Sequence, residues 1–81
     1  MGVAVNPIGP RDTEWALYDR LGYQIGLIRK TPWPDTPFMI LPERGSRLDG
    51  VALLHTSLNA ALIAIERYLG GTCELVGGSA L

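Results

Sequence analysis

The stretch TSLNAALIAIERYL, residues 56–69, decides the fold of this chain. Its large apolar residues recur at spacings of four, three and four, the period of a helix with one face on a core. They are Leu58, Leu62, Ile65 and Leu69. A hydroxyl of Thr56 or Ser57 can accept a hydrogen bond from a first-turn N–H, and Gly70-Gly71 can end a helix in the left-handed conformation. These signals predict a helix over residues 57–69.

The predicted helix also carries small and apolar residues outside its core-facing side. Ile63 falls in an otherwise polar sector, and Ala60 and Ala64 lie on its flank. Ile63 alone fits the ordinary scatter of apolar residues on protein surfaces. Together with Arg67 one turn later, however, these residues could face a second helix, because small side chains let two backbones come close.

Short alternating segments before the helix predict β-strands. Residues 14–18 and 23–30 alternate in side-chain character, and the turn sequence Asp19-Arg20-Leu21-Gly22 between them predicts a hairpin over residues 14–30. Three more segments can form strands: the apolar run 38–41, residues 48–54, in which Asp49-Gly50 could kink the chain, and residues 72–76 at a sheet edge.

This order of elements predicts an α+β fold. We expect a three- or four-stranded antiparallel meander covered on one face by the single C-terminal helix, which is a two-layer sandwich. Pro7, Gly9 and Pro10 predict a loose N-terminal arm over residues 1–13, in which a short edge strand could still form. Residues 14–76 would then form one domain and residues 77–81 a mobile tail.

Length and composition limit the classes of function. The 81 residues are 47% hydrophobic and 19% charged, which argues against disorder, and no apolar run approaches the length of a membrane span. The single cysteine, Cys73, cannot form an internal disulfide, and no signal peptide is recognisable, so we expect a cytoplasmic protein. A domain of this size buries only about 60% of its surface, so a partner that binds its folded form, including a second copy, would stabilise it.

The titratable residues indicate no enzyme. His55 is the only histidine, and Cys73 lies beside Glu74 at a helix C-terminus, where a reactive thiolate is disfavoured. Their spacing matches no nucleophile motif, and no glycine-rich phosphate loop or carboxylate cluster is present. We therefore expect neither catalysis nor a metal nor a cofactor. A small enzyme built around His55 and Cys73 is the third and weakest hypothesis.

Basic residues are concentrated in the middle of the chain. Residues 20–47 hold five basic and two acidic residues, a net charge of +3, although the whole chain carries −1. The basic residues are Arg20, Arg29, Lys30, Arg44 and Arg47. In element order, the expected strands and helix resemble small DNA-binding modules that lay a three-stranded sheet into the major groove. DNA binding through these residues is the alternative function, and the competing explanation is that they only solubilise the sheet.

Trp33 lies in a proline-rich connection, Pro32-Trp33-Pro34, which three prolines in six residues make stiff. Its indole can either cover an open edge of the core or contact a partner. The sequence thus predicts a non-enzymatic protein–protein interaction module that forms a homodimer or docks on a larger protein. The expected contact residues are Trp33, Ala60, Ile63, Ala64 and Arg67.

Overall fold

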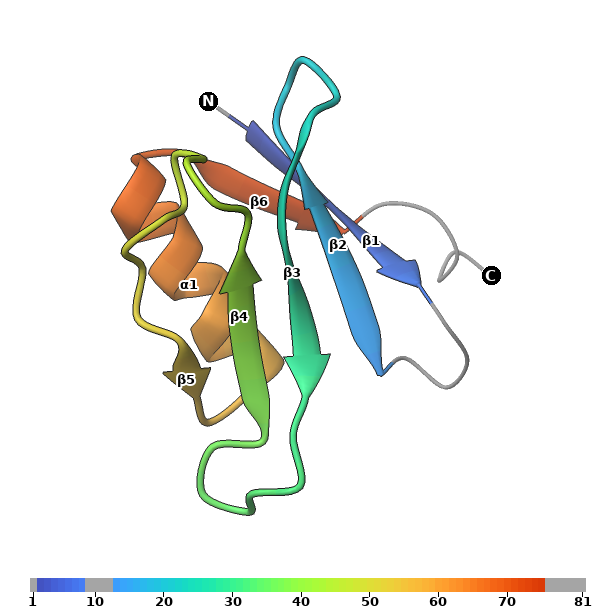
Figure 1. The fold of residues 1–81 in the computed structure, drawn as a ribbon, viewed down its shortest axis with the longest axis vertical. Helices are drawn as coiled ribbons and strands as arrows, with labels where there is room; N and C mark the ends of the chain where they lie inside the picture. The colour runs from blue at the N-terminus through green and yellow to red at the C-terminus, as the bar shows by residue number, and fades with distance from the viewer. Residues whose placement is uncertain (1, 9–12, 76–81) are drawn as a thin grey trace.

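The structure, a computed structural model, describes residues 2–8 and 13–75 and has an α+β fold (Figure 1). In these residues it contains the elements β1 (Gly2–Ile8), β2 (Glu14–Tyr18), β3 (Gln24–Lys30), β4 (Phe38–Pro42), β5 (Leu54–His55), α1 (Leu58–Leu69) and β6 (Thr72–Leu75). The strands form one curled sheet in the order β5-β4-β3-β2-β1-β6. Neighbouring strands are antiparallel except β1 and β6, which run parallel. The sheet is therefore mixed and larger than the expected meander.

The predicted helix is confirmed, and its two ends are capped as the sequence indicated. The Ser57 hydroxyl accepts a hydrogen bond from the backbone N–H of Ala60 at 3.0 Å, which makes Ser57 the N-cap. Gly70 adopts the left-handed conformation with φ 72°, and its N–H donates to the Glu66 carbonyl. The helix consequently begins at Leu58 and ends at Leu69.

The core lies between α1 and one face of the sheet. Trp15 and Leu17 of β2 point into it together, as their alternation predicted, and the Trp15 ring lies 5.8 Å from that of Phe38. Ala61 and Ile65 of α1 are completely buried against the strands. The other large apolar residues of the predicted helix face pack around this cluster; they are Leu58, Leu62 and Leu69.

A β-bulge in β3 brings two isoleucines to the same face of the sheet. Leu17 pairs with Gly26, whereas Tyr18 pairs with Gln24, so Ile25 is an extra residue in the ladder. Strict alternation would place Ile25 and Ile28 on opposite faces, but both are buried in the one core. Gly26 follows the bulge, and its backbone lies close to the Leu41 carbonyl.

The expectation of a loose N-terminal arm over residues 1–13 is corrected by the structure. Residues 2–8 form β1, which lies inside the sheet between β2 and β6, with Val3 and Val5 buried. Pairing with β2 and β6 orders this segment despite Pro7, because Pro7 lies near the end of the strand. The rest of that arm, residues 9–12, and the tail expected at residues 77–81 lie outside the described residues.

The expected strand over residues 48–54 is also corrected. This segment consists mostly of turns, in which Gly50 has a positive φ of 106°, and only Leu54–His55 pair with β4. Leu48 and Val51 belong to these turns, and their side chains are buried in the core. Their apolar character is therefore explained by core packing and does not require a strand. The hairpin over residues 14–30, the strand at 38–41 and the edge strand after α1 are confirmed, although the last strand is parallel to its neighbour.

Replacing Gly26 by alanine should destabilise the fold. A Cβ atom there would lie 2.8 Å from the Leu41 carbonyl oxygen and 3.0 Å from the Pro42 Cα, both of which are backbone atoms that cannot rotate away. We expect Gly26→Ala to lower the free energy of unfolding by about 1–3 kcal/mol in urea denaturation. Gly2→Ala is the matched control, because no atom lies within 4 Å of the new methyl group, and it should change stability by less than about 0.5 kcal/mol.

Candidate interaction site and arginine hollow

The outer side of α1 faces away from the strands and carries the residues expected to contact a partner. Eight large apolar side chains are exposed among the described residues, and Ile63, at 40%, is the aliphatic one of these on α1. Arg67 is also exposed, while Ala60 and Ala64 are half-buried beside them. This side of the helix is therefore mostly apolar, with small side chains, and carries one positive charge, Arg67, in its last turn.

Trp33 lies on the loop between β3 and β4 and is 50% exposed. It is not a member of the core cluster, so the structure favours the exposed alternative for its indole. Thr31 holds the loop together, because its hydroxyl accepts from the Trp33 N–H at 3.1 Å and donates to the Thr36 carbonyl at 2.8 Å. A half-exposed indole on a loop closed in this way loses little conformational entropy when it binds.

The five basic residues considered for DNA binding lie at two opposite ends of the sheet. Arg29 pairs with Glu14 at 3.0 Å, and the Lys30 ammonium lies 5.8 Å from the centre of the Phe38 ring, both at the end of β3. Arg20 precedes β3, and Arg44 and Arg47 follow β4. Because β3 and β4 are antiparallel, these three arginines lie at the other end of the strands. The structure does not bring the five into one basic stripe.

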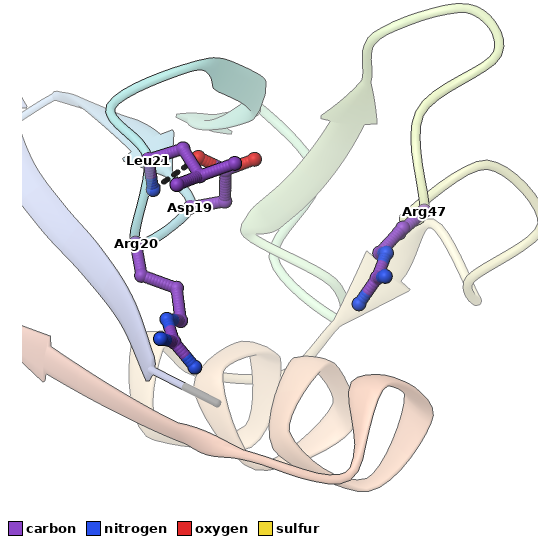
Figure 2. A pocket seen from close by; sticks show the side chains of 4 residues that line it. All are labelled: Asp19, Arg20, Leu21 and Arg47. Atoms are coloured by element: carbon purple, nitrogen blue, oxygen red, sulfur yellow. Dashed lines mark hydrogen bonds between the residues drawn. The ribbon is translucent and has the colours of Figure 1, made fainter.

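Arg20 and Arg47 instead line the same hollow of about 340 Å³. Asp19 and Leu21 complete its lining, and Figure 2 shows the two arginine side chains extending from separate loops toward the helix side of the sheet. A second hollow of about 310 Å³ shares Asp19 and Arg20 and reaches the start of β1 and Glu74. The sequence analysis named both arginines but did not place them on one hollow. They are separated by 26 residues, and the pairing of β3 with β4 brings their turns to the same end of the sheet.

His55 and Cys73 lie at opposite edges of the sheet, with α1 between the strands that carry them. His55 belongs to β5, and its Nε2 lies 2.7 Å from the Ala52 carbonyl oxygen. Cys73 belongs to β6, where its thiol donates to the Leu62 carbonyl at 3.7 Å. Burial, reinforced by the nearby Glu66 carboxylate, raises the pKa of the Cys73 thiol to about 11. This thiol is poorly suited to nucleophilic attack at neutral pH.

Within residues 2–8 and 13–75, no three His, Cys, Asp or Glu side chains gather as a metal site would require. No helix in this part of the chain is both long and apolar enough to cross a bilayer.

Comparisons with known proteins find no relative of this chain. No family model matches it, and searches of curated proteins and of solved structures return no match either.

The raised pKa of Cys73 predicts slow alkylation in the folded state. At pH 8 a thiol with a pKa of about 11 is ionised on the order of a hundredfold less than one at the ordinary value of 9.0. We expect iodoacetamide to modify the folded protein slower by about that factor than the protein unfolded in urea. Equal rates in the two states would contradict the burial and charge environment described for Cys73.

The same pKa shift predicts how stability depends on pH. Between pH 9 and about 11 the thiol ionises in the unfolded chain but stays protonated in the folded one, so the unfolded state binds fewer protons. The free energy of unfolding should therefore fall as pH rises through this window. Because tyrosine and lysine also titrate there, the contribution of Cys73 is measured as the difference between the natural protein and Cys73→Ser, which should lose this part of the pH dependence.

Proposed function

We propose that this chain is a non-enzymatic protein–protein interaction module that self-associates through the outer side of α1. The observation that carries the proposal is the position of Ile63, which is 40% exposed on a helix whose other large aliphatic residues pack against the core. Half-buried Ala60 and Ala64 beside it leave room for a second helix to approach closely. A second copy of the chain supplies a helix with the same properties.

The charge on this side of α1 favours an antiparallel pair of helices. Asn59, Ile63 and Arg67 follow one another at intervals of four residues, so they form one row along the helix. In a two-fold pair centred on Ile63, Arg67 of each copy lies opposite Asn59 of the other. A parallel pair would instead bring the two Arg67 side chains together, which costs free energy through like-charge repulsion.

Trp33 supplies a second contact, on the β3–β4 loop. Its N–H bond to the Thr31 hydroxyl and the Thr31 N–H bond to the Pro37 carbonyl at 2.8 Å fix the loop before any partner binds. Half-exposed tryptophans on ordered loops are common centres of binding energy in protein interfaces. Trp33 and α1 are different elements, so each is tested by its own substitution.

DNA binding, the alternative function, stays a prediction and has less support from the arrangement of charge. Arg29 is engaged by Glu14, and the remaining arginines of the set lie at the far end of the sheet. A major-groove reader of this kind would need basic side chains along one face. Retention on duplex DNA that weakens steeply with salt and is reduced in both Arg29→Ala and Arg47→Ala would restore this alternative. A cytoplasmic location, which the lone cysteine suggested, also stays a prediction.

Ile63→Glu should abolish self-association. The substitution places a carboxylate at the centre of the helix pair, where it would be desolvated without a partner, while in the monomer the same position is open to water. We expect the natural chain to sediment as a dimer at high micromolar concentration and Ile63→Glu to sediment as a monomer with unchanged thermal stability. Trp33→Ala should weaken the association without abolishing it.

The matched control is Tyr23→Glu, which replaces another exposed apolar residue, 69% accessible, in the turn just before β3. It should leave the sedimentation profile of the natural chain unchanged. A natural chain that remains monomeric at high micromolar concentration, or a dimer that Ile63→Glu leaves intact, would exclude the proposed interface.

A further inference from the structure

Among the described residues, β6 forms one edge of the sheet and β5 forms the other (Figure 1). An edge strand offers backbone N–H and C=O groups with which a strand of another molecule can pair. β5 offers few of them, because only Leu54 and His55 belong to it. β6 has four residues, Thr72–Leu75, and three of them are exposed. Of the two edges, β6 is therefore the one that could extend the sheet into a second molecule.

The backbone groups of β6 are divided between its two sides. Successive residues of a strand point their N–H and C=O groups alternately toward one neighbour and toward the other. The Cys73 N–H donates to the Oε2 of Glu66 at 2.8 Å, so it is not used in the ladder with β1 and faces the free side of the strand. The same alternation turns the backbone of Leu75 to the free side. Cys73 and Leu75 are thus the residues that an added strand would meet.

Glu66 reaches this free side from the second half of α1. Its backbone carbonyl accepts from the N–H groups of Gly70 at 2.8 Å and Gly71 at 3.2 Å, and these bonds end the helix. Its half-buried side chain extends further and serves the Cys73 N–H. After burial, the charge of Glu66 is also the second cause of the raised pKa of the Cys73 thiol, which agrees with a carboxylate close to this residue.

Other contacts hold Cys73 in place. Its side chain packs against the core cluster, its thiol donates to the Leu62 carbonyl, and β6 pairs with β1 over four residues. The carboxylate of Glu66 adds something different, because it occupies the outward N–H of Cys73 with a charge-assisted bond. The carbonyl oxygen of an added strand would have to displace this carboxylate and would then lie beside its negative charge.

We propose that Glu66 is an edge guard, a side chain that occupies the outward N–H of Cys73 and so prevents β6 from pairing with the β6 of a second copy. A second copy presents the same edge, so two β6 strands could pair antiparallel about a two-fold axis and continue one sheet through both molecules. The proposal concerns strand pairing and does not rest on the helix pair proposed for α1.

The test compares Glu66→Ala with Glu66→Gln, each combined with Ile63→Glu so that the proposed contact through α1 is absent from both. In Glu66→Ala we expect the Cys73 amide to exchange its hydrogen about tenfold faster or more, because a charge-assisted bond is lost. Relative to the Ile63→Glu parent, the average mass in sedimentation equilibrium should rise with concentration at high micromolar protein, and exchange of the Leu75 amide should slow as it does. Alanine favours a helix, so far-ultraviolet circular dichroism should be unchanged.

Two variants serve as controls. Glu66→Gln keeps an oxygen that can accept from the Cys73 N–H, so it should sediment like the parent. Glu43→Ala, in the same background, removes one negative charge from the exposed turn after β4 and should also sediment like the parent.

Two results would overturn the proposal. If Glu66→Ala sediments like the parent and its Leu75 exchange does not depend on concentration, the Glu66 bond only tethers the chain after α1. If Glu66→Gln or Glu43→Ala associates as strongly as Glu66→Ala, loss of charge alone explains the association. All comparisons are made with the Ile63→Glu parent, so they give the same answer whether or not the natural chain dimerises through α1.

Discussion

The parallel pairing of β6 with β1 is the constraint on which the rest of the structure depends. Because β5 and β6 are the two edges of the sheet, the chain must pass from one edge to the other between residues 55 and 72, and α1 makes that crossing. A helix of 12 residues is about 18 Å long, whereas six flat strands span about 24 Å. The sheet must therefore curl toward the helix, and the bulge at Ile25 supports this by adding local twist.

The two ends of the strands carry different groups of residues. At one end, β3 finishes with Arg29, paired with Glu14, and the loop that follows β3 carries Trp33. At the other end, the Ile25 carbonyl joins the turn after β4 to the start of β3, so the arginines of two turns line one hollow. The proposed interface, on the outer side of α1, belongs to neither end.

Local sequence signals predicted the elements that local interactions stabilise. The helix, with its Ser57 cap and Gly70 stop, and the β2–β3 hairpin around Asp19 were both readable from short segments. β1 was expected only as a possible short edge strand, because Pro7, Gly9 and Pro10 suggested a loop and half of its pairing is with residues 72–75, about 70 positions away. Residues 48–54 were expected as a possible strand because their apolar residues, Leu48 and Val51, are buried. A sequence pattern does not show whether a buried apolar residue lies in a strand or in a turn.

The candidate site also combines features that single segments predict with features that depend on distant segments. The exposure of Ile63 and Trp33 could be anticipated from their own segments, while the placement of Arg20 and Arg47 on one hollow depends on the register of β3 and β4.

The position of β1 has a consequence for how the chain acquires its structure during synthesis. As the ribosome releases the polypeptide, β1 to β4 can form their antiparallel ladder early, since each strand finds its neighbour close by in the sequence. The second edge of β1 then stays unsatisfied until α1 and β6 have emerged, and its backbone N–H and C=O groups are open to other chains in that interval. The nascent protein is consequently most vulnerable to intermolecular strand pairing just before its last strand arrives.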